Sequence, residues 1–202
     1  RMICIVDYDG GNINSLSNIL NRLGIAFKIS KELNDLNNAK KIILPGVSNF
    51  SYCIKKIKEL NLEKCLKSQI FEKKKPFLGI CSGMQILSKF SEEGNTNGLS
   101  FIDATVKKFN SSPEHRVPHV GWNKVYFNEN KLFKNIKNGS RFYFCHSFYV
   151  ETNDSNIDTA KTNYNVDFVS ALNINNIYAV QFHPEKSFES GMKLIDNFNN
   201  LD

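Results

Sequence analysis

Short apolar runs alternate with amphipathic stretches through the first half of the chain. Between these runs, residues 12–23 and 51–70 place apolar side chains at helical spacing, and Gly24 is a typical stop after the first helix. Alternating strands and helices predict a parallel sheet with helices on both faces. The four runs with the length of buried strands are residues 2–8, 25–30, 41–46 and 76–80.

From Phe101 onward, short β-rich runs are separated by Asn, Gly and Asp turns. Helical spacing returns only near the end, at Met192, Leu194, Ile195 and Phe198. We therefore expect an α/β fold: an open, mostly parallel sheet flanked by helices, with an antiparallel β-rich section, in a single domain over residues 1–202. The predicted late strands are residues 102–109, 122–127, 141–150, 167–173 and 177–182.

Composition narrows the class of protein. A chain of 202 residues with 41% hydrophobic content suits one core, and it has no apolar run long enough to span a membrane. The N-terminal run lacks a signal-peptide cleavage site, so we expect a cytoplasmic protein. Five cysteines without paired short spacing predict reduced thiols rather than disulfides or a zinc ribbon. The net charge is +6, but the sequence contains no motif that combines aromatic and basic residues for nucleic-acid binding. The charge therefore favours an anionic ligand or an acidic partner over nucleic acid.

The segment "FLGICSGMQIL", residues 77–87, carries the strongest chemical signal. Cys81 lies between Gly79 and Gly83, directly after a predicted strand and before a helical segment. In such a G-x-C-x-G turn the glycines remove colliding side chains, so that a thiol is exposed at a helix N-terminus, where thiolate is favoured. The backbone N–H of Ser82 would then be one donor of an oxyanion hole.

His183 is the strongest candidate for a base. It ends an apolar strand in "VQFHPEKS", and Glu185 follows two residues later, on the same side of an extended segment stiffened by Pro184. A carboxylate there would hold the imidazole in one tautomer. His146, next to Cys145, is compatible with a core histidine, and we expect no metal site.

A second glycine turn, "LPGVSNF" at residues 44–50, ends the third predicted strand. In a doubly wound sheet this loop would lie near Cys81, and the N–H of Val47 or its neighbour could be the second oxyanion donor once that peptide is suitably oriented. An ordinary Pro-Gly strand exit is equally compatible with the local sequence.

These motifs resemble a known family. G-I-C-S-G-M-Q at Cys81 and H-P-E at His183 are similar to the signature of class I (triad) glutamine amidotransferases. Five further motifs extend the resemblance, within that family, to the glutaminase subunits of imidazole glycerol phosphate synthases. They are "DYDGGN" (7–12), "LPGV" (44–47), "VPHVGWN" (117–123), "FYFCHSFY" (142–149) and "QFHPEKS" (181–187).

The resemblance implies a reaction and a partner. Cys81 would attack the side-chain amide of glutamine, and His183 would protonate the leaving ammonia and then activate water to hydrolyse the thioester. Ammonia would pass to a (β/α)8-barrel synthase subunit in a heterodimer that makes imidazole glycerol phosphate in histidine biosynthesis. No metal or organic cofactor is implied.

The resemblance also implies roles for residues outside the triad. Gln85 would hydrogen-bond the substrate, Gly46 and Val47 would line the oxyanion loop, and the backbone around His146, Ser147 and Phe148 would hold the α-amino and α-carboxylate groups of glutamine. The resemblance also implies a surface of this chain that faces an acidic rim on the barrel. The residues of this surface would be Asn12, His119, Trp122, Asn123 and Lys186.

Two positions depart from the family pattern. Ser48 stands where glycine is common in the oxyanion loop, and Ser82 stands where leucine commonly follows the nucleophile. They leave open a paralogous glutaminase subunit that supplies ammonia for amidino-sugar synthesis in surface glycans. A docking subunit without turnover and a cysteine hydrolase that acts alone on peptides are further alternatives.

Overall fold

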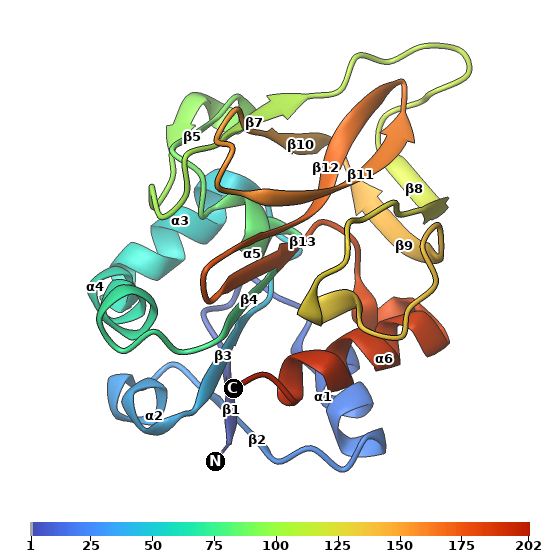
Figure 1. Cartoon of the computed structure of the whole chain (residues 1–202). Coiled ribbons are helices and arrows are strands. Elements are labelled where there is room, and N and C mark those ends of the chain that lie inside the picture. Colours follow the sequence, from blue (N-terminus) through green and yellow to red (C-terminus); the bar gives the residue numbers. More distant parts are fainter. Residues whose placement is uncertain (1) are drawn as a thin grey trace.

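The computed structural model describes residues 2–202, and its main feature is a sheet of eleven strands (Figure 1). Ten strands form a continuous path, and β11 (Asp158–Tyr164) pairs with β12 beside it. The path runs β2 (Phe27–Ser30), β1 (Ile3–Val6), β3 (Lys41–Leu44), β4 (Phe77–Ile80), β13 (Ile177–Val180), β12 (Val166–Ile174), β10 (Phe148–Glu151), β7 (Thr105–Lys108), β5 (Phe90–Ser91) and β6 (Thr96–Asn97).

The direction of the strands changes at β13. From β2 to β13 every neighbouring pair is parallel, whereas β12 runs antiparallel to β13, to β11 and to β10. The predicted fold class, a mostly parallel α/β sheet with an antiparallel section, is confirmed. Because β4 and β13 are parallel neighbours, with Gly79 opposite Ala179, the segments that follow their carboxyl ends lie side by side.

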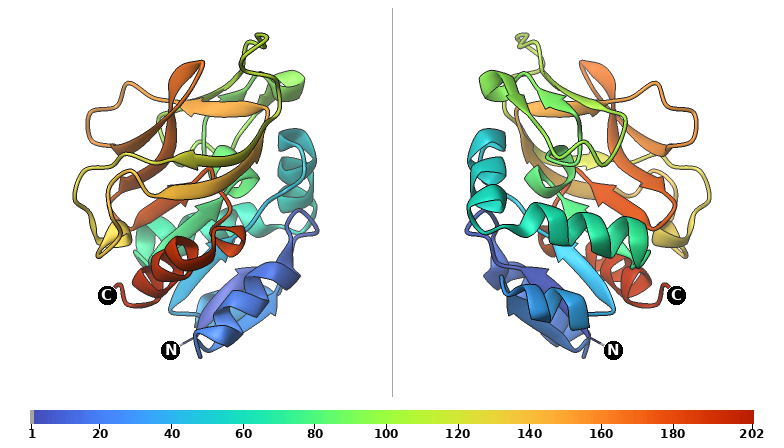
Figure 2. Two further views of the ribbon diagram at one scale, coloured as in Figure 1. Left: turned by 90° about the vertical axis from the view of Figure 1, so that its right-hand side faces the viewer. Right: turned by 90° about the vertical axis from the view of Figure 1, so that its left-hand side faces the viewer.

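Helices cover both faces of the parallel part (Figure 2). In β1, Cys4 and Val6 pack toward one apolar cluster, and Ile3 and Ile5 pack toward the other, as expected of a strand buried on both faces. The first cluster includes side chains of α2 (Leu33–Asn38), α3 (Phe50–Glu59) and α4 (Leu62–Lys67). The second includes side chains of α1 (Ile13–Arg22) and α6 (Phe188–Asn199).

The predicted helix over residues 51–70 is wrong as a single element. The chain instead forms α3, then α4, then the π-helical turn η1 (Ser68–Glu72). The break lies at Asn61, whose φ of +56° is left-handed and whose N–H donates to the Lys58 carbonyl. Asparagine tolerates this left-handed conformation better than most residues. The helical spacing of apolar residues continues on both sides of Asn61, so the apolar pattern alone does not reveal the break.

The predicted strand over residues 141–150 is also two elements. β9 (Arg141–His146) pairs with β8 (His119–Lys124) in a separate two-stranded sheet, and β10 belongs to the main sheet. Only Ser147 separates β9 from β10. The strand predicted at residues 122–127 corresponds to β8, which begins three residues earlier, at His119. The sequence did not predict β11.

The remaining elements are short. α5 (Ser82–Gln85) is a single helical turn after β4. Residues 2–202 also contain three 3-10 turns: η2 (Glu93–Asn95), η3 (Lys131–Phe133) and η4 (Pro184–Lys186). No helix within residues 2–202 has the length and apolar character needed to cross a membrane.

Candidate active site

Cys81 occupies a strained turn between β4 and α5. Its φ of +54° and ψ of −112° are unusual for a residue with a side chain, and its N–H donates to the Val180 carbonyl at 2.8 Å. A Cβ on Gly83 would lie 2.0 Å from the Leu44 carbonyl oxygen, and one on Gly79 would lie 2.6 Å from the Gly83 oxygen. The two glycines therefore let α5 pack directly against the backbones of β3 and β4, which fixes the turn.

The sulfur of Cys81 lies inside a pocket rather than in the open. The residue is only 5% exposed, which corrects the expectation of an exposed thiol. It lines a cavity of about 330 Å³ together with Val47, Cys145 and His146. The Cys145 carbonyl oxygen is 4.0 Å from Sγ, so β9 forms a wall over the nucleophile and limits access to the pocket mouth.

His183 and Glu185 form a buried pair beside this sulfur. His183 Nδ1 and Glu185 Oε1 are 2.7 Å apart, so Nε2 is the ring nitrogen that interacts with Cys81. Burial alone would lower the pKa of His183. The negative charge of a Cys81 thiolate, its hydrogen bond with the imidazole and the Glu185 carboxylate outweigh burial and raise that pKa to about 10. The structure thus brings together the three residues predicted as nucleophile, base and orienting carboxylate.

The backbone around His183 is held by β9. Its N–H donates to the Tyr143 carbonyl at 2.9 Å, and its carbonyl accepts from the Ser187 hydroxyl at 2.6 Å. Ser187 Oγ also accepts from the Tyr143 N–H at 3.0 Å. The base is therefore fixed to the two-stranded sheet as well as to β13.

The prediction made the Val47 N–H an oxyanion donor once its peptide is suitably oriented, and in this structure that peptide faces the other way. The Val47 N–H donates to the Gly10 carbonyl at 2.7 Å, and the Gly46 carbonyl faces the Ser82 N–H at 3.4 Å. Both predicted oxyanion donors are thus engaged within the protein, with a carbonyl oxygen where the substrate oxyanion would be stabilised. Because the Gly46 C=O and the Val47 N–H belong to one peptide unit, a single inversion of that unit would release both donors.

Gln181 is a site residue that the sequence reasoning missed. Its side-chain nitrogen donates to Cys81 Sγ at 3.6 Å, and its Oε1 accepts from Gln85 at 2.8 Å. Gln85 also donates to the Phe148 carbonyl at 3.0 Å, so its nitrogen is already satisfied without substrate. The sequence signal that could have identified Gln181 is its spacing from His183. It precedes His183 by two residues in an extended segment, so the two side chains face the same side.

His146 and His119 form a buried pair behind the pocket. His146 Nδ1 donates to the Phe148 carbonyl at 2.7 Å, His119 Nδ1 donates to His146 Nε2 at 2.9 Å, and Asn123 donates to His119 Nε2 at 3.2 Å. Burial is the main cause that lowers the pKa of His146 to about 3 and of His119 to about 4, so both rings are neutral at pH 7. His119 is 3% exposed and lies behind the surface on which it was expected.

Three of the other residues expected to face a partner lie around η4, which contacts α1 and β9. The fourth, Asn123, points elsewhere, because its side chain donates to His119 and to the Asn163 carbonyl. Trp122 is exposed on β8 and stacks on Phe188, with ring centroids 5.4 Å apart. Lys186 Nζ lies 5.8 Å from the centre of the Tyr143 ring, and Asn12 precedes α1. Ser147 and Phe148 stand at the break between β9 and β10 and line the Cys81 pocket.

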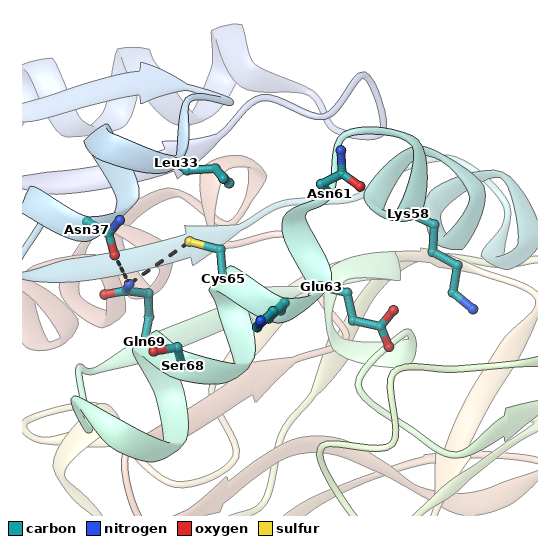
Figure 3. Close-up of a pocket in the computed structure, with 9 residues that line it drawn as sticks. Leu33, Asn37, Lys58, Asn61, Glu63, Cys65, Ser68 and Gln69 are labelled. Carbon is teal, nitrogen blue, oxygen red and sulfur yellow. Dashed lines mark hydrogen bonds between the residues drawn. The ribbon is translucent and has the colours of Figure 1, made fainter.

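A larger cavity, of about 600 Å³, lies between α2, α4 and η1 (Figure 3). There, Gln69 donates to Asn37 and approaches the Cys65 sulfur at 4.0 Å. Since η1 leads into the start of β4, this cavity is remote from Cys81, which follows the end of the same strand. Burial raises the pKa of Cys65, and no histidine lines this cavity among the described residues. The cavity therefore lacks the pairing of cysteine with histidine that is present at Cys81.

Comparisons with known proteins agree with this geometry. Residues 4–200 match the family glutamine amidotransferase class-I. The chain is 44% identical over 198 residues to imidazole glycerol phosphate synthase subunit HisH 2 of Methanococcus maripaludis, covering 98% of each chain. It is 44% identical over 204 residues to imidazole glycerol phosphate synthase subunit HisH of Leptospira borgpetersenii, covering 99% of this chain and 100% of the relative.

Solved structures show the same fold at low sequence identity. A glutamine amidotransferase structure has a TM-score of 0.76 at 18% identity and covers 96% of both chains. PurLQS from Thermotoga maritima has a TM-score of 0.72 at 21% identity and covers 98% of this chain and 97% of that one. With a family match over nearly its whole length, the chain belongs to the class-I glutamine amidotransferases.

Proposed function

We propose that this chain is the glutaminase subunit of an imidazole glycerol phosphate synthase and hydrolyses L-glutamine to glutamate and ammonia. The observation that carries the chemistry is the convergence of Cys81, in a strained turn, with the buried pair of His183 and Glu185. The relatives at 44% identity, both named as HisH subunits of that synthase, support the assignment.

The reaction follows from this arrangement. The Cys81 sulfur forms a bond to the amide carbon of glutamine, and collapse of the tetrahedral species breaks the C–N bond. His183 gives its proton to the departing nitrogen, so ammonia leaves and the imidazole becomes a base. It then takes a proton from water, whose oxygen attacks the thioester, and glutamate leaves as the C–S bond breaks. Glu185 holds the ring in the required tautomer.

Substrate placement follows from the pocket walls. Ser147 and Phe148 line the same cavity as Cys81, and their backbone groups would hold the α-amino and α-carboxylate groups of glutamine. The Ser82 and Val47 N–H groups would stabilise the oxyanion after the Gly46–Val47 peptide inverts. The resting orientation, with both donors engaged, supports weak turnover until a partner binds.

The partner would be a (β/α)8-barrel synthase subunit that receives ammonia directly. The relatives are named as subunits, and the surface around η4 presents Trp122 and Lys186 close to the catalytic His183 and Glu185. An exposed aromatic pair with neighbouring cations suits an interface with an acidic rim.

The alternative partner, a related synthase for amidino sugars, is not favoured by the names of the relatives. A complementation assay separates the two: the chain should restore growth without histidine to a strain that lacks its own glutaminase subunit. Failure to do so, with a stable and well-expressed protein, would favour the alternative.

The experiment that tests the reaction uses the reconstituted pair of subunits. Cys81→Ala should abolish synthase activity with glutamine and leave activity with ammonium salts intact, because only the nucleophile is lost. Cys65→Ala, at the remote cavity, is the matched control and should retain both activities. Glutamine-dependent activity that survives in Cys81→Ala would rule the proposal out.

A further inference from the structure

The two positions at which the sequence departs from the family pattern meet in one hydrogen bond. The Ser82 hydroxyl donates to the Ser48 carbonyl at 2.5 Å, and Ser82 is buried. A leucine at position 82 would offer no such donor. This contact joins the residue after the nucleophile to the residue after the oxyanion peptide.

Hydrogen bonds hold both ends of the oxyanion loop. At one end, the buried Tyr8 hydroxyl donates to the Pro45 carbonyl at 2.6 Å. At the other end, the Ser48 N–H donates to the Gly10 carbonyl at 3.2 Å. The Ser48 carbonyl accepts from the Ser82 hydroxyl at 2.5 Å and, more weakly, from the Cys53 thiol at 3.7 Å. The Gly46–Val47 peptide lies between these two fixed points.

Inversion of this peptide would leave both fixed points intact. The Gly10 carbonyl accepts from Val47 and from Ser48, so it keeps a partner when the Val47 N–H turns away. The contact from the Ser82 N–H to the Gly46 carbonyl is long, at 3.4 Å, and adds little to the resting state. Inversion therefore breaks one well-formed hydrogen bond and disturbs neither Pro45 nor Ser48.

We propose that the Ser82 hydroxyl is a positioning group that fixes the Ser48 backbone, so that the Gly46–Val47 peptide inverts in place and its N–H reaches the oxyanion. The inference rests on the proposed glutaminase function and adds a residue to it. The hydroxyl would act through the loop backbone, because its hydrogen bond is to the Ser48 carbonyl.

The test is Ser82→Ala in the complex with the barrel subunit. Loss of the hydroxyl should lower kcat for glutamine about tenfold or more and change KM less than about twofold, because donor placement matters mainly in the transition state. Synthase activity with ammonium salts should be unchanged. In the isolated variant, the Val47 and Ser48 amides should exchange hydrogen faster than in the unmodified chain.

Ser88→Ala is the matched control. Ser88 follows the same helical turn and is fully buried, and its hydroxyl makes no hydrogen bond within the described residues. It should leave kcat, KM and amide exchange at Val47 unchanged.

Two outcomes for Ser82→Ala would overturn the proposal. One is an unaltered kcat in the complex. The other is faster turnover in the absence of the barrel, because the hydroxyl would then restrain inversion. If the unmodified complex itself does not use glutamine, the proposed function fails instead.

Discussion

At the scale of single residues, the protonation of His183 depends on the groups at the two ends of its ring. The neighbouring thiolate and the Glu185 carboxylate raise its pKa to about 10 in spite of burial. A folded-state pKa above the unfolded value of about 6.5 means that the imidazolium stabilises the fold below pH 6.5. That contribution declines as the pH rises toward 10.

Cys81→Ala should therefore lower the pKa of His183, because the thiolate is the largest cause that raises it. NMR titration of the imidazole signals measures the shift directly. Cys4→Ala, which removes a buried thiol from β1, should leave the titration of His183 nearly unchanged. An unaltered pKa in Cys81→Ala would show that the sulfur and the ring do not interact.

Glu185→Gln tests the other end of the ring. The amide keeps the size of the side chain and loses the charge that holds the proton on Nδ1, so we expect kcat to fall about 10²-fold or more, with a smaller effect on KM. Steady-state glutaminase assays of the complex measure both constants. Glu189→Gln, on the exposed first turn of α6, should behave as the unmodified chain.

The sequence predicts which residues react, but it does not predict the hydrogen bonds of the resting state. Cys81, His183 and Glu185 stand in local motifs whose spacing predicts their roles. The approach of Gln181 to the sulfur and the orientation of the Gly46 carbonyl depend on packing between distant segments. Glycine at position 46 permits more than one backbone conformation, so the local sequence does not fix the direction of the Gly46–Val47 peptide plane.

At the scale of elements, the sequence predicted the alternation of strands and helices but not where they break. The break at Asn61 depends on one residue in a left-handed conformation, and the division at Ser147 separates two β-rich runs with no change of composition. The residues of β9 and of β10 both have the pattern of a strand. Only the pairing of each with a distant strand shows that they belong to different sheets.

The contact of α5 with β3 gives a prediction about stability. In Gly83→Ala the new methyl group would lie 2.0 Å from the Leu44 carbonyl, so the backbone must move, and we expect a loss of about 3 kcal/mol. Gly24→Ala is the control: its φ is +67° and nothing lies near its Cβ position, so backbone strain alone should cost about 1 kcal/mol. Urea unfolding measures both. Equal losses would show that α5 tolerates displacement.

At the scale of the whole molecule, the parallel pairing of β4 with β13 creates the site. About a hundred residues separate Cys81 from His183, and adjacent parallel strands bring their carboxyl ends to the same edge. The fold class predicts such an edge but not which strands are neighbours, so the meeting of the two motifs was a hypothesis until the strand order was known.

The exposed aromatic pair beside η4 gives a prediction about assembly. Phe188 is 77% exposed and stacks on Trp122, the only tryptophan, which is 45% exposed. Trp122→Ala should raise the Kd for the barrel subunit about 30-fold, equivalent to about 2 kcal/mol. Phe71→Ala removes an aromatic side chain of the same exposure on η1, away from η4, and should leave Kd unchanged. Calorimetric titration gives both constants, and equal effects would place the interface elsewhere.

The resting oxyanion loop predicts that glutamine turnover depends on the partner. With the Val47 N–H bonded to Gly10 and the Gly46 carbonyl facing Ser82, the isolated chain lacks a preorganised oxyanion hole. One such donor is worth about 10²–10³ in kcat, so the barrel subunit with its ligand should stimulate kcat at least about 10²-fold. Alkylation of Cys81 by iodoacetamide, which needs no oxyanion hole, should change far less on complex formation. If glutamine turnover is equally fast with and without the barrel, the Gly46–Val47 peptide inverts freely and its resting orientation has no regulatory effect.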